Sequence, residues 1–332
     1  MNITTRPVLI VLTAWMIVIS MAGCESKDQS RPLSFETMQT AEGILPETPQ
    51  FIKASDGVAL AYYPKMPEST PEAALIFLHG GGAYSGAGYQ HLAGGLAEKY
   101  HAAVYLVDLR GHGHSGGPRG DTPSVEQIWK DLRLMVETVR KNHPNLPLYL
   151  GGHSSGGGLI LNYYTWSGKA DVDGYFFISP QFGYKSETAR PQSQTSFAKP
   201  RLWVFVVSAL SGGRCLGHTR AVSFNYPQDV LTAKPLMLKY ITRHMSVAIT
   251  PDHPQEQFGK IDKRFALYIG AKDELFVPQQ VIQYAGYAQK TIQTNSVNRI
   301  IENESHLSIL SAADDLIGQT IIAWQKTNRT DK

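Results

Sequence analysis

Residues Leu148–Leu161 read LYLGGHSSGGGLIL, in which a short apolar run meets a serine between glycines and a second apolar run follows. Gly152–Gly156 within this stretch have the form G-x-S-x-G, with Ser154 at the centre. The pattern is typical of a sharp turn from a strand into a helix, which exposes the serine hydroxyl. Its glycines permit the close backbone approach that so tight a turn requires. We therefore predict that Ser154 is a nucleophile held in a strained backbone conformation.

The same pattern occurs a second time at Gly113–Gly117, with Ser115 at its centre. Ser154 follows a strand-like run and opens an apolar stretch that can continue as a helix. Ser115 is instead followed by Gly-Gly-Pro, which favours a loop. We therefore interpret Ser115 as a turn residue.

Composition places the chain among ordinary globular proteins. Its 332 residues suffice for one large domain or two small ones, and hydrophobic residues make up 42%. The net charge of +3 is spread without long charged runs, so nucleic acid is not an expected partner. The chain has two cysteines, Cys24 and Cys215, and no disulfide is expected if Cys24 carries a lipid.

The first 23 residues are typical of a secretory signal. Arg6 is the only charge before Glu25, Val8–Met21 is almost wholly apolar, and small residues precede Cys24. The apolar run is shorter than the ~20 residues of a membrane helix, although an uncleaved anchor stays open as the alternative. In both cases the domain is expected outside the cytoplasm, held at a membrane.

Met21–Cys24 resembles the lipobox of bacterial lipoproteins. The resemblance implies that Cys24 is lipidated and becomes the mature N-terminus, and that the protein resides in the bacterial cell envelope. Glu25 after the cysteine resembles a signal for the outer membrane of two-membrane bacteria. Residues 24–47 are mainly polar and without apolar periodicity, which predicts a flexible tether.

Short apolar runs alternate with helix-like segments along much of the chain. Strands are expected at 73–78, 102–109, 148–153, 174–179, 265–270 and 298–301, after a hairpin at 51–63. A helix is predicted to open at Thr122-Pro123, where a capping residue precedes a proline. The alternation predicts an α/β fold with a doubly wound, mostly parallel sheet covered on both faces.

The alternation of strand-like and helix-like segments is lost between about residues 184 and 259. This change predicts a largely helical cap inserted before the acid-bearing strand expected at 265–270. A second packing module without substrate contact is the alternative. The predicted division is a signal at 1–23, a tether at 24–47, a core at 48–183 and 260–328, and the cap at 184–259.

A serine nucleophile needs a base, and the base needs an orienting acid. In doubly wound hydrolases the order along the chain is serine, acid, histidine. Asp273 follows one predicted strand and His306 follows the next, so both are expected beside Ser154 at one sheet edge. Glu274 adjoins Asp273 and is the competing acid, which we expect to point elsewhere.

Other polar residues fit catalysis less well. Asp314 and Asp315 lie beyond the histidine and are interpreted as solvated helix residues. Asp108, His112 and His114 suggest a metal site, but an H-x-H pair in a glycine turn is more often structural and no four-ligand spacing is present. Neither a metal nor a cofactor is expected.

An oxyanion formed by attack on a carbonyl needs preorganised N–H donors. One is expected from the backbone N–H of Ser155, and the other from the glycine loop His79–Gly82. Gly81 is the first choice for that second donor and Gly82 the second choice, while His79 is expected to be a structural hydrogen-bonder beneath the loop. A phosphate cradle is the competing interpretation, but no Lys-Ser/Thr pair follows the glycines.

Five motifs together carry a family resemblance: FLHGGG at 77–82, DLRGHGHSG at 108–116, GHSSG at 152–156, GAKD at 270–273 and ESH at 304–306. They resemble the successive signatures of the α/β-hydrolase superfamily over about residues 50–325, and most of all its monoglyceride lipase, lysophospholipase and serine aminopeptidase branch. The resemblance implies Ser154, Asp273 and His306 as a catalytic triad, and a cap between the sixth and seventh strands. The extra glycine, Gly82, departs from the branch.

The resemblance implies a serine hydrolase of carboxylic esters with a mid-length or long acyl chain, such as monoacylglycerols or lysophospholipids. An aminopeptidase or amidase is the first alternative, for which Glu187 and Glu256 are candidate carboxylates that nothing marks in the sequence. A non-enzymatic binding protein is the second. The expected partners are an acyl ester or lipid substrate and a membrane, contacted through Cys24.

Overall fold

The computed structural model describes residues 32–40, 48–191 and 197–330. The predicted signal at 1–23 and the predicted lipidation site Cys24 lie outside these residues. Within the described ranges, no helix combines the length and apolar character that crossing a bilayer requires.

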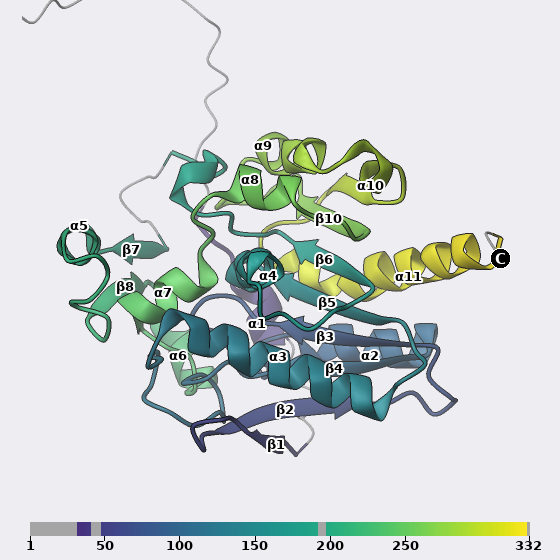
Figure 1. The fold of residues 1–332 in the computed structure, drawn as a ribbon, viewed down its shortest axis with the longest axis horizontal. Coiled ribbons are helices and arrows are strands. Elements are labelled where there is room, and N and C mark those ends of the chain that lie inside the picture. Colours follow the sequence, from purple (N-terminus) through teal and green to yellow (C-terminus); the bar gives the residue numbers. More distant parts are fainter. Residues whose placement is uncertain (1–31, 41–47, 192–196, 331–332) are drawn as a thin grey trace, which may run out of the picture.

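An eight-stranded sheet with the order β1-β2-β4-β3-β5-β6-β10-β11 forms the centre of the molecule (Figure 1). β1–β2 and β2–β4 pair antiparallel and the remaining neighbours pair parallel. The strands are β1 Gln50–Lys53, β2 Ala59–Lys65, β3 Ala73–Leu78, β4 Ala102–Val107, β5 Leu148–His153, β6 Gly174–Ile178, β10 Phe265–Gly270 and β11 Val297–Ile301. The doubly wound, mostly parallel sheet predicted from the apolar runs is confirmed.

Helices cover both faces of this sheet. In Figure 1, α3 Val125–Asn142 and α4 Ser155–Thr165 lie in front, and α2 Gln90–Tyr100 and α11 Ala313–Thr330 lie behind. Alternate strand residues therefore enter two separate apolar clusters, with Ile76 of β3 in one and Phe77 in the other. Both side chains are buried, which explains why the central strands read as unbroken apolar runs.

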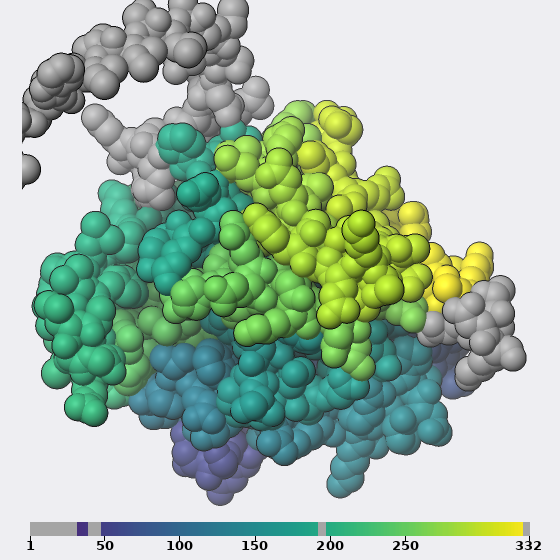
Figure 2. Space-filling view, turned by 45° about the horizontal axis from the view of Figure 1, so that its top comes forward, coloured from purple at the N-terminus to yellow at the C-terminus, as the bar shows by residue number. Residues whose placement is uncertain are grey.

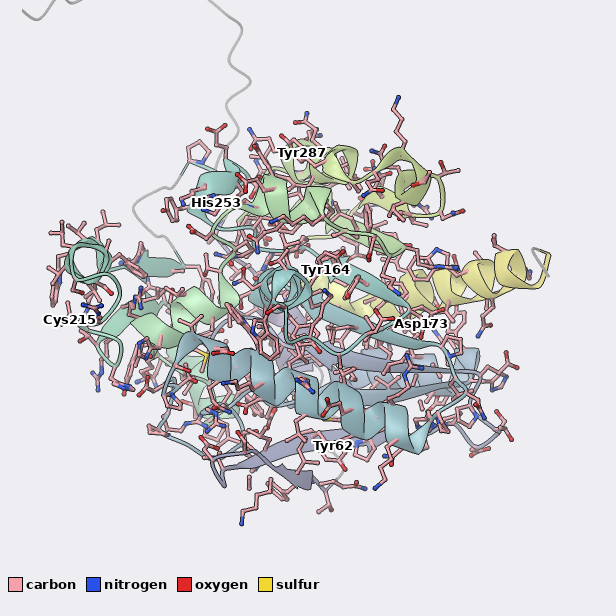
Figure 3. All side chains as sticks on the ribbon, viewed as in Figure 1. Tyr62, Tyr164, Asp173, Cys215, His253 and Tyr287 are labelled. Atoms are coloured by element: carbon pink, nitrogen blue, oxygen red, sulfur yellow. The ribbon has the colours of Figure 1, made fainter. Side chains whose placement is uncertain are left out.

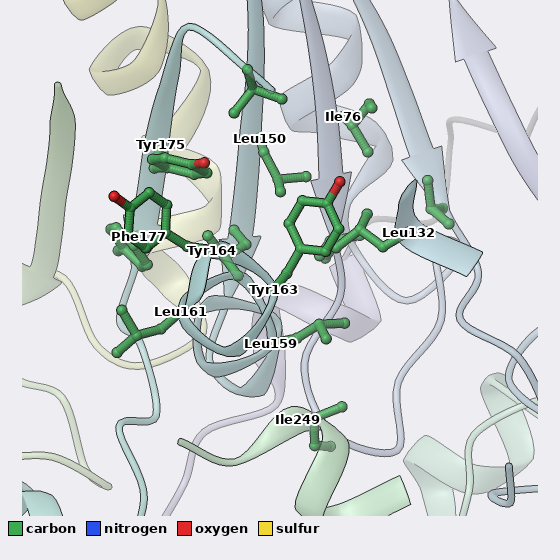
Figure 4. Packing of buried hydrophobic residues seen from close by; sticks show 14 of the residues in the cluster. Ile76, Leu132, Leu150, Leu159, Leu161, Tyr163, Tyr164, Tyr175, Phe177 and Ile249 are labelled. Carbon is green, nitrogen blue, oxygen red and sulfur yellow. The ribbon is translucent and has the colours of Figure 1, made fainter. Parts of the chain in front are cut away.

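The front cluster fixes the helix that follows the serine. Leu159, Leu161 and Tyr163 of α4 pack beneath Leu150 of β5 and its neighbours (Figure 4). Each fully buried leucine contributes about 1.5–3 kcal/mol to folding. The start of α4, and with it Ser154, is thereby held against the sheet.

Helix α3 begins later than the sequence predicted. Its N-cap is Ser124, whose hydroxyl oxygen accepts the N–H of Gln127 at 3.2 Å. Thr122 is buried, and its hydroxyl donates to the carbonyl oxygen of Ser124 at 3.0 Å. The prediction of a helix opening at Thr122-Pro123 is therefore wrong by two residues, because a second capping residue follows the proline.

The segment predicted to be a cap, which the structure describes at residues 184–191 and 197–259, is not purely helical. It contains the helices η1 Tyr184–Ser186, α5 Leu202–Leu210, α6 Gln228–Ala233, α7 Arg243–Ile249 and α8 Pro254–Gly259. It also contains a three-stranded antiparallel sheet of β7 Ala198–Pro200, β8 Arg220–Phe224 and β9 Tyr240–Thr242. Strands this short leave no readable alternation, so the sequence analysis did not find the small sheet. The cap's teal and green atoms adjoin the yellow-green segments that follow it (Figure 2).

Two further parts of the chain border the site. The helices α9 Pro278–Gln283, η2 Tyr284–Tyr287 and α10 Lys290–Thr294 link β10 to β11, and η3 Ser308–Ser311 follows β11. Near the N-terminus, α1 Glu36–Thr40 packs on the domain, and Met38 is only 2% exposed. Residues 32–40 are thus folded, although they belong to the stretch interpreted as a flexible tether.

Candidate active site

The turn from β5 into α4 has the strained geometry expected for a nucleophile. Ser154 adopts φ 52° and ψ −119°, a conformation that non-glycine residues rarely occupy. A Cβ on Gly152 would lie 2.5 Å from the carbonyl carbon of Gly156, and one on Gly156 would lie 2.6 Å from the carbonyl oxygen of Leu78. The steric explanation for both glycines is confirmed.

Ser154, His306 and Asp273 come together as a continuous hydrogen-bonded chain. Oγ of Ser154 lies 3.1 Å from Nε2 of His306, and Nδ1 of His306 lies 2.9 Å from Oδ2 of Asp273. Because an ionised carboxylate only accepts, Nδ1 carries the proton and Nε2 is free to accept the serine proton. In this geometry Nε2 faces the serine hydroxyl with a free lone pair, which is what general-base catalysis requires of a histidine.

Asp273 is held in its ionised form within a nearly closed environment, being only 1% exposed. Burial alone would raise the pKa of Asp273, but His306 and two backbone N–H groups outweigh it and lower that pKa below its usual value. Those two groups are the N–H of Leu275 and of Phe276, each 2.9 Å from Oδ1. The carboxylate is therefore charged and oriented at neutral pH.

His153, the residue before the serine, links the site in a way the sequence analysis missed. Its Nε2–H donates to the backbone carbonyl of His306 at 2.9 Å, and its Nδ1 accepts the hydroxyl proton of Tyr89 at 2.9 Å. The Tyr89 oxygen in turn accepts the N–H of Gly80 at 2.8 Å. Burial lowers the pKa of His153 to about 3, so the ring is neutral and keeps these roles. The only signal in the sequence was its place inside the G-x-S-x-G motif.

The glycine loop after β3 lies beside the serine, as predicted. A Cβ on Gly81 would lie 3.2 Å from Oγ of Ser155, and the hydrogen bonds of the described residues include none donated by the N–H of Gly81 or of Ser155. Both N–H groups are thus available to a ligand. His79 lies beneath the loop, where it donates to the Gly80 carbonyl at 2.9 Å and accepts from the N–H of Leu109 at 3.1 Å.

The cap holds this loop from the other side. The hydroxyl of Tyr226 donates to the Gly81 carbonyl at 2.8 Å, and the N–H of Leu238 donates to the Gly82 carbonyl at 2.8 Å. Gly82 has φ 72°, and a Cβ there would lie 2.7 Å from the ring of Phe224. These contacts explain the extra glycine at position 82, and Tyr226 and Phe224 were not found from the sequence.

Ser115 occupies a different environment from Ser154. Its hydroxyl donates to the Asp108 carbonyl at 2.6 Å and accepts the N–H of Ala61 at 2.8 Å, within a buried turn. The Asp108 carboxylate accepts the N–H groups of Ser85 at 2.7 Å and of His114 at 2.8 Å. Among the residues that the structure describes, no three His, Cys, Asp or Glu side chains are grouped to hold a metal ion.

Three predictions about carboxylates need correction or comment. Glu274 does not point away, because its Oε2 accepts the backbone N–H of His306 at 2.9 Å. Asp314 is not solvated: it is 1% exposed and pairs with Lys99 at 2.8 Å. Glu187 and Glu256, the candidate carboxylates for a substrate amine, are both exposed.

A mostly parallel sheet with a serine elbow after β5, an acid after β10 and a histidine after β11 defines an α/β-hydrolase fold. The model of the family described as "Serine aminopeptidase, S33" matches residues 69–300. The chain belongs to this family.

Curated relatives match parts of the chain. A monoacylglycerol lipase of Mycolicibacterium smegmatis is 34% identical over 110 residues, which are 32% of this chain and 38% of the relative. The monoglyceride lipase of Rattus norvegicus is 30% identical over 168 residues, 51% of this chain and 53% of that protein. The chain thus spans about half the length of these relatives or less.

Solved structures share the fold over most of the chain. A soluble variant of the monoglyceride lipase of Saccharomyces cerevisiae has a TM-score of 0.64 at 17% identity and covers 85% of this chain and 96% of its own. The monoacylglycerol lipase of Paleococcus ferrophilus has a TM-score of 0.59 at 21% identity, and the match covers 80% of this chain and 97% of the lipase chain. At such identities the likeness concerns the fold alone.

Proposed function

We propose that this protein is a serine hydrolase that cleaves carboxylic esters such as monoacylglycerols or lysophospholipids. Oγ of Ser154 attacks the ester carbonyl carbon while its proton passes to Nε2 of His306. Asp273 orients the ring and stabilises the imidazolium. The N–H groups of Gly81 and Ser155 receive the oxyanion.

The tetrahedral intermediate then breaks its bond to the alcohol, which leaves with the proton from His306, and an acyl-serine remains. Water gives a proton to His306 and attacks the acyl carbon, and a second collapse releases the acid and restores Ser154. The observation that carries this proposal is the hydrogen-bonded chain from Ser154 to Asp273, with links of 3.1 and 2.9 Å.

The ester is favoured over the amide as substrate by the relatives, which are named monoacylglycerol and monoglyceride lipases. The family description names an aminopeptidase, and such an enzyme needs a carboxylate for the substrate amine. The two candidates considered, Glu187 and Glu256, are both exposed to solvent. A role confined to binding is disfavoured because the side chains of Ser154, His306 and Asp273 are joined by hydrogen bonds, an arrangement that binding alone does not require.

A lipid substrate is supported by the surface of α5, at the far left of Figure 1. Leu202, Trp203, Val206 and Leu210 are 70%, 56%, 57% and 84% exposed. The exposed Cys215 lies just after this helix (Figure 3). Residues 197–228 contain four Lys or Arg and no Asp or Glu. An apolar, basic surface of this kind suits contact with an anionic lipid layer.

The proposed location is the bacterial cell envelope, with Cys24 lipidated and the domain outside the cytoplasm. In a bacterial host fed an alkyne fatty acid, the label is expected on the full chain and is expected to be lost in Cys24→Ala. Label retained in Cys24→Ala would contradict an anchor at this residue.

The activity is tested on residues 25–332 with a fluorophosphonate probe, followed by p-nitrophenyl esters, monoacylglycerols and aminoacyl anilides. An adduct on Ser154 and ester turnover are expected, both lost in Ser154→Ala and in His306→Ala. Ser115→Ala is the matched control and keeps the adduct. Cleavage of anilides alone would favour the aminopeptidase, and the absence of both adduct and turnover would overturn the proposal.

A further inference from the structure

The carboxylate of Glu274 bridges the catalytic histidine loop and the N-terminal segment. Its Oε2 accepts the backbone N–H of His306 at 2.9 Å, and its Oε1 accepts the backbone N–H of Ser34 at 3.2 Å. Ser34 and Glu274 are 240 positions apart in the chain. Each oxygen of this half-buried side chain thus has its own donor.

The bond to Glu274 completes the fixation of the His306 backbone. On one side of the residue Glu274 holds the N–H, and on the other side His153 holds the carbonyl at 2.9 Å. With both peptide groups held, the direction of the side chain from the backbone is set. The ring itself is held by Asp273 and by the edge-to-face contact with Phe276, at 5.3 Å between centroids.

Two neighbouring N–H groups of this loop find their acceptors within it. Ser305 donates to Oγ of Ser308 at 2.8 Å, and Glu304 donates to the Ile301 carbonyl at 3.4 Å. The N–H of His306, by contrast, donates to a carboxylate of the acid-bearing loop, that of Glu274, at 2.9 Å. A hydrogen bond to an ionised acceptor is roughly twice as strong as a neutral one.

The N-terminal segment 32–38 also contacts the cap that holds the oxyanion loop. The ring of Phe35 packs on Phe197 at 6.0 Å and on Tyr226 at 5.6 Å between centroids. Tyr226 is the residue whose hydroxyl holds the Gly81 carbonyl. Helix α1 of this segment lies against η3, which begins two residues after His306.

We propose that Glu274 is a positioning residue for the base His306, and that the N-terminal segment orients Glu274 through the N–H of Ser34. The inference rests on the proposed function. Glu274 touches no reacting atom; it keeps Nε2 of His306 at hydrogen-bonding distance from Ser154. Since displacements near 1 Å at a reacting group cost up to about a hundredfold in rate, losing this bond lowers turnover.

Glu274→Gln is the first test, because its one carbonyl oxygen can occupy only one of the two acceptor positions and the amide nitrogen in the other position accepts no hydrogen bond. With a short soluble ester we expect kcat to fall roughly tenfold or more with KM within about twofold. Glu302→Gln, an exposed carboxylate in the histidine loop, is the matched control. A kcat within twofold of the parent in Glu274→Gln overturns the proposal.

Ser34→Pro tests whether the N–H of Ser34 orients Glu274, because proline lacks the backbone N–H. Ser34→Ala retains this N–H and is the control. We expect kcat to be lower in the proline variant than in the alanine variant. The double variant with Glu274→Gln should be no slower than Glu274→Gln alone, since both changes remove one linked interaction. Additive reductions of kcat in the double variant would contradict a shared role of Ser34 and Glu274.

Amide hydrogen exchange separates this inference from the proposed function. The peptide containing His306 should exchange faster in Glu274→Gln and in Ser34→Pro than in Glu302→Gln, whether or not an ester is cleaved. Unchanged exchange overturns the positioning role even in an active enzyme. A parent protein without turnover but with faster exchange in the variants would count against the hydrolase proposal alone.

Discussion

His153 and His306 are joined side chain to backbone, with Nε2 of His153 2.9 Å from the carbonyl oxygen of His306. Because a carbonyl only accepts, the His153 ring must carry its proton on Nε2, and its Nδ1 is then the acceptor for Tyr89. One neutral imidazole thus connects the glycine loop after β3 with the loop that carries the base.

This buried ring makes stability depend on pH. Burial lowers the pKa of His153 from 6.5 to about 3, so between these values the unfolded chain binds a proton that the folded chain does not. The contribution of the neutral His153 ring to the free energy of unfolding is fully present above pH 6.5. It is lost as the pH falls toward 3, by up to about 1.4 kcal/mol per pH unit. Urea unfolding between pH 7 and about 4 should show this loss.

The variant His153→Gln isolates that residue, because glutamine offers a donor and an acceptor but does not titrate. Its free energy of unfolding should fall less steeply with decreasing pH than that of the parent. Some slope remains, since burial also lowers the pKa of His112 to about 3. Identical slopes in parent and variant would show that His153 does not contribute.

Gly82→Ala should destabilise the protein and slow ester turnover. The residue has φ 72°, and the new Cβ would lie 2.7 Å from the Phe224 ring and 3.0 Å from the Leu238 carbonyl oxygen. We expect a loss of about 1–3 kcal/mol in unfolding free energy. Gly94→Ala in α2 is the control, because a Cβ there meets nothing within 4 Å and alanine favours helix. Equal stability in both variants would contradict the strain argument.

Tyr226→Phe removes only the hydroxyl that donates to the Gly81 carbonyl at 2.8 Å. The loop that presents the Gly81 N–H then loses one constraint worth about 1 kcal/mol, and kcat on a soluble ester should fall about fivefold. Tyr62→Phe, whose hydroxyl bonds Gln50 in the β1–β2 hairpin, is the matched control. A similar kcat in both variants would show that the Tyr226 hydroxyl does not contribute to catalysis through the Gly81 loop.

The exposed face of α5 should govern binding to lipid vesicles. With residues 25–332 and vesicles rich in an anionic phospholipid, Leu202→Glu with Leu210→Glu should raise the lipid concentration for half-binding at least roughly tenfold, because each leucine side chain transferred from water is worth about 1.5–3 kcal/mol. Ile322→Glu, at an apolar side chain on α11 that is 39% exposed, adds one negative charge and is the control for each single leucine variant, Leu202→Glu and Leu210→Glu. Equal sedimentation of the leucine variants and Ile322→Glu would exclude α5 as the lipid-facing surface.

The sequence was sufficient where local pattern determines structure. Strand β3 at 73–78, β5 at 148–153 and β10 at 265–270 coincide with the apolar runs, since buried parallel strands are apolar on both faces. The order of the strands in the sheet then brings Asp273, after β10, and His306, after β11, to the edge where Ser154 lies.

What the sequence did not provide are contacts between distant segments. His153 meets His306, Tyr226 meets Gly81 and Ser34 meets Glu274 across separations of 153, 145 and 240 residues. No periodicity or motif encodes such pairs, because they arise only when distant segments of the core, the cap and the N-terminus pack together. The short strands of the cap were missed for a related reason, as three to five residues are too few to reveal alternation.

The bonds from Tyr226 and Leu238 to the glycine loop restrict how a substrate reaches the serine. A hinged swing of the whole cap would pull both donors, and the Phe224 ring, away from Gly81 and Gly82. The cap and the glycine loop that would bind the oxyanion are therefore joined by hydrogen bonds. A large movement of the cap would remove the contacts that hold this loop in place. In the proposed enzyme we therefore expect the substrate to enter by rearrangement of side chains along the cap edge, without displacement of the whole cap.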